Sequence, residues 1–214
     1  MSTVQVDTIN ESTTGSGVTV DGVLIKDNAV NTDTITEKTS GSGVTVDGVN
    51  IKDGKVGGGY TITEVDQWAL TAALTSDAVI SSNLSRLSTE ILAGEALGTG
   101  MSVSSGYWTF PSTGYWLVRI QASWRTASND GCSLKIYGTN DNSTYNQIGQ
   151  TGFGKSNDGS NNDSTTFGEI FLKITDTSND KIRFNTDSIG SGSELRGSSS
   201  YLFTGFLFMK VGEV

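Results

Sequence analysis

The residues of this sequence that could do chemistry are clustered oxygen-bearing side chains and flat aromatic rings. Asn157, Asp158 and Asn161, followed by Asn162 and Asp163, supply oxygen atoms of the kind that calcium takes as ligands. The cluster lacks the spacing and the closing glutamate of a calcium-binding loop. An exposed polar loop explains the same residues. Calcium could bind there but is not indicated, so we predict no cofactor and no metal site.

Polar segments with nearby aromatic rings are suited to contact a sugar. Segments 139–145, 153–164 and 188–199 are rich in Asn, Ser, Gly and Asp, whose polar groups can hydrogen-bond to sugar hydroxyls. Within them, one tyrosine and one phenylalanine could offer flat surfaces to a sugar ring. Solvated loops without any ligand are the alternative. The candidate ligand-binding residues are Tyr145, Phe153, Asn157, Asp158 and Asn161.

Catalytic chemistry is disfavoured by the residue types that are missing. The chain contains no histidine, which removes the usual general base and the commonest zinc ligand. Cys132 is the only cysteine, so the chain forms no internal disulfide and no thiolate metal cluster. The glycine-rich strings at 57–59 and 152–154 lack the residues that complete a phosphate or dinucleotide loop. Carboxylates are scattered through turns without a paired acid. We therefore predict that the protein is not an enzyme.

Strands must position these loops, because hydrophobic alternation dominates the C-terminal part of the chain. In Gly114–Trp124, every second side chain from Trp116 is apolar, which is typical of a strand with one core face. Segments 133–137, 167–175 and 181–185 add further strands, and turn-rich segments separate them. This pattern predicts an all-β sandwich or barrel.

The last strand, predicted over Tyr201–Met209, is apolar on both faces. An antiparallel strand of this kind needs cover on its outer face too. We predict burial between subunits near a symmetry axis. A central strand of a monomeric sandwich, covered by a loop, is the alternative. The candidate interface residues are Tyr201, Phe203, Leu207, Tyr115 and Leu117.

The N-terminal part is a tandem repeat. Asp7–Thr32 is copied as Asp33–Gly58, with 18 of 26 positions identical. Within a copy, Val18 and Val20 alternate with polar residues, and Asp21–Gly22 supplies the turn of a small β-hairpin. So short a unit cannot bury its own core, which favours stacking with other copies into a thin shaft. Two hairpins appended to an ordinary domain are the alternative.

The resulting domain prediction has three parts. Residues 1–58 form an N-terminal attachment segment and two 26-residue β repeats, and residues 79–214 form the head. Between them, residues 59–78 are a collar or linker, in which Asp66–Leu74 is expected to form a short helical turn packed through Trp68.

Charge and hydropathy restrict the partners. The net charge of −9 disfavours nucleic acid and anionic membrane surfaces. No apolar run reaches the ~20 residues that a membrane-spanning helix needs, so no membrane insertion is expected. The N-terminus lacks the features of a signal peptide, which predicts synthesis and folding in a cytoplasm without secretory export.

Two motifs in the head resemble a known family. Tyr107–Trp116 (YWTFPSTGYW) resembles the early strands of the trimeric jelly roll shared by complement globular heads and tumour-necrosis-factor-like domains. Phe203–Phe208 (FTGFLF) resembles the closing strand of that family, and the similarity spans about Val79 to Val214. The resemblance implies a homotrimeric jelly-roll β-sandwich, but it carries over no ligand-binding residue.

The N-terminal half resembles the fibre proteins of aquatic bacteriophages, of cyanophage type. The resemblance lies in the repeats and in the lead-in from Val65 to Ser102. It implies a trimeric virion fibre of tail-fibre type, made in the host cytoplasm, whose N-terminus joins other virion proteins. Its head would bind a host-surface glycan or protein during adsorption. A capsid decoration, head fibre or baseplate-associated protein with an assembly role is the alternative, favoured by the small number of repeats.

Overall fold

The computed structural model describes residues 62–86, 95–127, 131–154 and 160–214, together with residues 40, 42, 44–46, 49–52 and 55–57. The chain divides into two compact units, 1–58 and 59–214. Every secondary-structure element among the described residues is a strand, which confirms the all-β class. None of the described residues forms a helix long and apolar enough to cross a bilayer.

The first unit contains one small antiparallel sheet. It consists of β1 (Val44–Val46), β2 (Val49–Lys52) and β3 (Lys55–Gly57). Val46 pairs with Val49 across a two-residue connection, so the hairpin predicted for each repeat is confirmed in the second copy. The first copy and the N-terminal attachment segment lie outside the described residues, and the stacked shaft stays a prediction.

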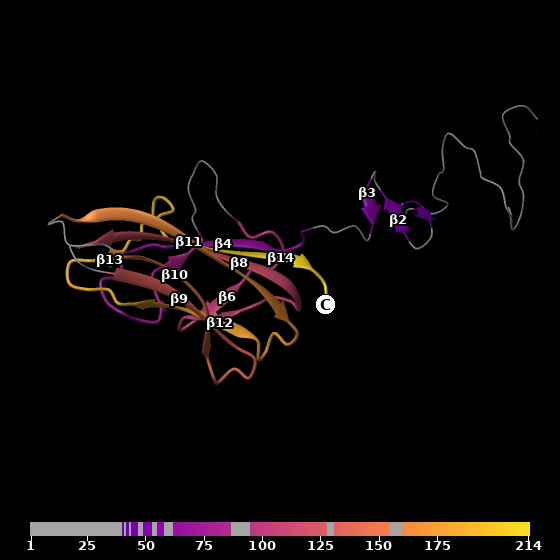
Figure 1. The fold of residues 1–214 in the computed structure, drawn as a ribbon. Helices are drawn as coiled ribbons and strands as arrows, with labels where there is room; N and C mark the ends of the chain where they lie inside the picture. The colour runs from indigo at the N-terminus through magenta and orange to yellow at the C-terminus, as the bar shows by residue number, and fades with distance from the viewer. Residues whose placement is uncertain are drawn as a thin grey trace, which may run out of the picture. The chain divides into compact units, whose positions relative to one another are not determined.

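The second unit, which we call the head, contains two antiparallel sheets that lie face to face, as Figure 1 shows with β4, β8 and β14 in one layer and β9 and β12 in the other. The larger sheet has the order β11-β8-β14-β4-β5, and β13 also pairs with β8. The smaller sheet has the order β10-β9-β12-β7-β6.

The strand bounds of the larger sheet are β4 Val65–Leu70, β5 Leu84–Ser85, β8 Gly114–Thr126, β11 Asn162–Ile174, β13 Glu194–Leu195 and β14 Gly205–Gly212. Those of the smaller sheet are β6 Ser102–Ser104, β7 Tyr107–Thr109, β9 Gly131–Thr139, β10 Asn146–Gly154 and β12 Lys181–Asp187.

The core lies between the two sheets and is rich in aromatic rings. Trp108 of β7 is fully buried, and its ring centroid lies 4.9 Å from that of Phe208 and 5.2 Å from that of Trp68. On β8, the predicted inward face is confirmed as buried; it comprises Trp116, Val118, Ile120, Ala122 and Trp124. The period-two alternation therefore identified the core face of the central strand correctly.

The helical turn predicted over Asp66–Leu74 is wrong. Residues 65–70 form β4, which pairs antiparallel with β14 from Val65 opposite Met209 to Ala69 opposite Gly205. The Ala and Leu residues favour a helix locally, but pairing with a strand about 140 residues away in the sequence prevails, since sheet preference depends on tertiary context. This segment therefore belongs to the head rather than to a linker.

The predicted bounds of the last strand also need correction. β14 begins at Gly205, so Tyr201 and Phe203 lie in the loop that precedes it. Along β14, Phe206 and Phe208 face the core, whereas Leu207 and Met209 are half-buried on the opposite face. The strand thus carries apolar side chains on both faces, as the sequence indicated.

Candidate functional site

The outer face of the larger sheet, turned away from the core, carries exposed apolar side chains beside charged ones. On β11, Phe167 and Phe171 are 64 % and 60 % exposed. The Phe171 ring stacks on the ring of Tyr115 in β8, with centroids 5.6 Å apart and planes 9° apart. Strand register places Leu117 between Phe171 and Met209, so apolar side chains run across three neighbouring strands. We call this surface the apolar face.

Strand register brings three of the predicted interface residues onto this face. Tyr115 and Leu117 project from β8, and Leu207 projects from β14 opposite Arg119 of β8. The other two, Tyr201 and Phe203, lie in the loop before β14, with ring centroids 4.7 Å apart. The side-chain amide of Gln121 donates a 2.9 Å hydrogen bond to the Phe203 carbonyl, which ties this loop to β8.

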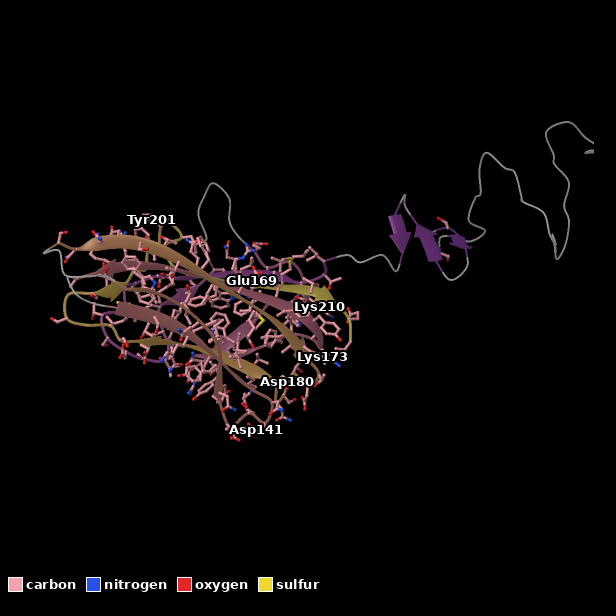
Figure 2. The ribbon with its side chains drawn as sticks, in the orientation of Figure 1. Asp141, Glu169, Lys173, Asp180, Tyr201 and Lys210 are labelled. Carbon is pink, nitrogen blue, oxygen red and sulfur yellow. The ribbon has the colours of Figure 1, made fainter. Side chains whose placement is uncertain are left out.

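An ion pair lies in the middle of the apolar face. Arg119 of β8 and Glu169 of β11 are cross-strand neighbours whose side chains are 50 % and 47 % exposed. Their closest nitrogen–oxygen distance is 2.7 Å. A hollow of about 130 Å³ lies beside Arg119, lined by Gln67, Gln121, Phe167, Leu202, Gly205 and Leu207. Figure 2 shows Glu169 on the larger sheet, with Tyr201 farther along the same side of the head.

The outer face of the smaller sheet carries a different cluster, built around a cation. Arg183 of β12 pairs in register with Tyr107 of β7 and with Tyr137 of β9. The central carbon of its guanidinium lies 5.1 Å from the ring centroid of Tyr137 and 4.8 Å from that of Tyr145. The Tyr107 and Tyr145 rings are themselves 5.2 Å apart. We call these four residues the Arg183 cluster.

The interior of the Arg183 cluster is partly desolvated. The Arg183 Nε and the Tyr145 hydroxyl are buried and have no hydrogen-bond partner. Burial raises the pKa of Tyr145, and the nearby Tyr107 adds to that effect while Arg183 opposes it. Tyr145, predicted to offer a flat surface to a sugar, instead lies against the guanidinium of Arg183.

The remaining predicted ligand-binding residues are not brought together by the described structure. Phe153 of β10 packs against the hydrophobic core. Asn161 is exposed in the residues before β11, and Asn157 and Asp158 lie outside the described residues. A shared site for these side chains therefore stays a prediction.

Asp163, from the same polar cluster, is engaged in ion pairs. Its two carboxylate oxygens lie 3.0 Å from Arg125 Nε and 2.8 Å from Arg196 Nη1. The hydrogen bond from Arg125 lowers the pKa of Asp163, and the charge of Arg196 adds to the shift. Within the described part of the chain, no group of three or more His, Cys, Asp or Glu side chains could hold a metal ion.

The turn at 139–145 is fixed by a single carboxylate. Asp141 Oδ1 accepts hydrogen bonds from the hydroxyl of Thr139 and from the backbone N–H groups of Ser143 and Thr144, and together these lower its pKa. A cleft of about 330 Å³ lies beside this turn; its polar lining includes Asn140, Asn146, Lys173, Asp180 and Lys181. Figure 2 shows Asp141, Lys173 and Asp180 at the same end of the head.

The buried ion pair of Asp66 and Arg86 was not predicted from the sequence. Asp66 of β4 is 2 % exposed and accepts hydrogen bonds from Arg86 Nε at 2.7 Å and Arg86 Nη2 at 2.6 Å. It also accepts from the indole N–H of Trp68 and the backbone N–H of Met101. The signal in the sequence was a charged residue at an inward position of a strand, but the helical interpretation of this segment concealed it.

The Arg183 cluster was not predicted from the sequence either, for a different reason. Lys181, Arg183 and Asn185 alternate with the buried Ile182 and Phe184, so the sequence shows that Arg183 faces outward. Two of its three tyrosines come from β7 and β9, and only the order of strands in the sheet brings them to Arg183.

Comparison with solved structures identifies the fold of the head. The crystal structure of murine APRIL at pH 5.0 matches with a TM-score of 0.51 and 10 % sequence identity, covering 69 % of this chain and 98 % of that one. Murine APRIL at pH 8.5 has a TM-score of 0.46 and 11 % identity over the same shares of the two chains. No family model matches the sequence. No curated protein matches it either. The head thus has a jelly-roll fold like that of murine APRIL, and at this level of identity the likeness shows the fold alone.

Proposed function

We propose that this chain is the subunit of a homotrimeric bacteriophage fibre of tail-fibre type. In this proposal the N-terminal segment joins other virion proteins, the β repeats form a shaft, and the jelly-roll head presents its loops to a host-surface glycan or protein during adsorption. The protein acts without catalysis, nucleic acid or membrane insertion, and it resides in the virion after synthesis in the host cytoplasm.

The apolar face carries this proposal. Two phenylalanines that are more than half exposed lie on one sheet face beside Leu117, Leu207 and Met209. Monomeric soluble proteins rarely expose a contiguous apolar surface of this kind, so it needs a partner. A symmetric oligomer, in which each copy contributes the same surface, provides cover without a second gene product. The bacteriophage assignment itself rests on the sequence resemblance of the repeats and the lead-in.

Solution mass, measured by light scattering, tests the assembly. We expect three chain masses for the intact protein. Leu207→Asp should break the trimer, because it would bury three unpaired carboxylates at the interface. Ile148→Asp is the matched control, since Ile148 is an exposed apolar residue of β10 in the other sheet. A monomeric wild type, or a Leu207→Asp variant that stays trimeric, would contradict this use of the apolar face.

Adsorption inhibition tests the role of the head. Purified protein added to host cells before the virus should reduce the adsorption rate if the head binds the same receptor. The expected reduction saturates with protein concentration, and it is lost with the monomeric Leu207→Asp variant because avidity requires three linked sites. Normal adsorption at saturating protein would argue against host recognition.

A capsid decoration, head fibre or baseplate-associated protein with mainly an assembly role is the second candidate. The presence of only two repeats favours it, because a longer shaft is expected for an adhesin that reaches a distant surface. Antibody labelling of virions separates the two functions, since label on capsid faces supports the second and label at the tail tip supports the first.

A further inference from the structure

We propose that the Arg183 cluster is a binding site for a carboxylate-bearing sugar, such as a uronic acid. Its carboxylate would pair with the guanidinium of Arg183, and its ring would lie against Tyr107. The inference rests on the proposed host-recognition function, to which it adds the chemical class of the receptor and a location on the outer face of the smaller sheet.

The first observation is a cation without an anion. No carboxylate or carbonyl oxygen among the described residues pairs with the guanidinium of Arg183. The Nε is buried without a hydrogen-bond partner, whereas neither Nη atom is among the buried side-chain atoms that lack one, and the whole residue is only half-buried. By contrast, the ammonium of Lys135, on the neighbouring strand β9, lies 2.9 Å from the carboxylate of Asp187. Among the described residues, an acid thus pairs with Lys135 and none pairs with Arg183.

The second observation is that Arg183 is held in place before any ligand arrives. The central carbon of its guanidinium lies over the rings of Tyr137 and Tyr145, at 5.1 Å and 4.8 Å from their centroids. Cation–π contacts of this kind restrict the side chain without using its hydrogen-bond donors. A planar guanidinium fixed in this way matches the two oxygens of a carboxylate in a bidentate pair.

The third observation is an accessible aromatic ring next to the cation. Tyr107 is 37 % exposed and lies opposite Arg183 in the strand register. The apolar face of a pyranose ring can pack on such a ring and remove apolar area from water. A cation and a flat ring on adjacent strands therefore suit a ligand that carries both a carboxylate and a sugar ring.

The position of the cluster agrees with the proposed assembly. The Arg183 cluster lies on the smaller sheet, whereas the apolar face lies on the larger one. A trimer that buries the apolar face leaves three Arg183 clusters on its outside. The net charge of −9 opposes a polyanion over the rest of the surface, so binding depends on local pairing at Arg183. Three such weak sites on one particle would bind a repeating acidic polysaccharide with avidity.

Affinity electrophoresis of the full chain tests the site with polygalacturonate as the probe. Fully methyl-esterified polygalacturonate is the matched neutral ligand, because esterification removes the charge and keeps the sugar ring. We expect retardation by the acid form and at least about tenfold weaker retardation by the ester, as the loss of a charged hydrogen bond predicts. Equal retardation by both, or none by the acid form, overturns the proposal.

Variants locate the binding on the cluster. Arg183→Gln should weaken the interaction at least about tenfold, whereas Lys181→Gln removes the same charge two residues along β12 and should change it by about twofold or less. Tyr107→Phe keeps the ring and should bind as the wild type does. Tyr107→Ala removes the ring and should bind more weakly. If the thermal unfolding profile shows that Arg183→Gln is misfolded, the comparison of Tyr107→Phe with Tyr107→Ala still tests whether the ligand binds at the cluster. Unchanged binding by Arg183→Gln, or equal losses in both charge variants, excludes this site.

Two outcomes separate this site from the proposed function. If wild-type protein blocks adsorption and Arg183→Gln blocks it equally, host recognition stands and the site is wrong. If the acid form binds through Arg183 but wild-type protein leaves adsorption unchanged, the site stands and host recognition is wrong.

Discussion

At the scale of single residues, carboxylates anchor the irregular parts of the head. Asp66 accepts four hydrogen bonds; one comes from Trp68 of the same strand, and the others link β4 to Arg86 and Met101. Asp141 closes the turn at 139–145, and Asp163 joins Arg125 to Arg196. The charge of each of these acids is thus matched by hydrogen-bond donors that fix the local structure.

We predict that Arg86→Met lowers the free energy of unfolding by about 3 kcal/mol, because it leaves the buried Asp66 carboxylate without its cation. The double variant Asp66→Asn with Arg86→Met should lower the free energy of unfolding less than Arg86→Met does alone, since no buried charge then remains. Urea denaturation at a fixed protein concentration measures both. An unchanged midpoint in Arg86→Met would show that the Asp66 carboxylate does not depend on Arg86 for its stabilisation.

The hydrogen bonds to Asp141 predict that the folded state loses stability as the pH falls. Its folded-state pKa lies below the unfolded value of about 3.9, chiefly because of the Thr139 hydroxyl. The unfolded state therefore binds a proton first, and the stability that Asp141 contributes is complete above about pH 4 and declines below it. Thermal unfolding between pH 2.5 and 6 at constant ionic strength should show a shallower decline in Asp141→Asn. Identical pH profiles for variant and wild type would contradict this role.

At the scale of elements, tight turns set the positions of the site residues. β6 and β7 are joined by Ser105 and Gly106, which both have positive φ values, 51° and 83°. This geometry fits a two-residue hairpin turn of type I′. The turn places Tyr107, the first residue of β7, beside Arg183.

Gly106→Ala should lower the free energy of unfolding by about 1–2 kcal/mol, since alanine disfavours positive φ and its Cβ would lie 2.7 Å from Val79 Cγ1. Gly154→Ala is the matched control, because a Cβ there meets nothing within 4 Å, and its effect should stay within about 0.5 kcal/mol. Chemical denaturation of both variants compares them. Equal effects would show that the turn at Gly106 tolerates a side chain.

Much of the fold was predictable from the sequence because its strands are long and regularly alternating. The inward face of β8 and the hairpin of the second repeat followed from spacing alone. β4 was not predictable in this way, because its partner β14 is distant in the sequence and its Ala and Leu residues favour a helix locally. The Arg183 cluster could not be predicted either, since the order β9-β12-β7 is a property of the sheet and not of any one strand.

At the scale of the whole molecule, the Arg119–Glu169 pair would place one positive and one negative charge inside the interface of the proposed trimer. The pair is half exposed in the single chain and lies among Phe167, Leu117 and Leu207. Burial of the apolar face in an assembly would remove both charges from water. A buried pair depends strongly on both partners, whereas apolar replacement of the two together is often tolerated.

We therefore predict that Glu169→Gln weakens trimer formation and that Arg119→Met with Glu169→Leu restores it to the wild-type level or above. Sedimentation equilibrium over a range of protein concentrations measures the association constant. The control is Lys135→Met, which breaks an ion pair on the other sheet and should leave association unchanged. If Glu169→Gln and Lys135→Met behave alike, the pair does not lie in the interface.

The pairing of β4 with β14 also decides how the head carries mechanical load. The chain enters the head just before Val65, and Val65 lies opposite Met209, so the C-terminus leaves at the same end, as Figure 1 shows. If a force pulled on the opposite end of the head while the N-terminal part was held, tension would run along β4 and shear it against β14. In shear, the hydrogen bonds of all five paired positions resist together, whereas peeling would break them one after another. For a force applied between these two ends, the pairing of β4 with β14 would therefore be loaded in shear rather than peeled apart.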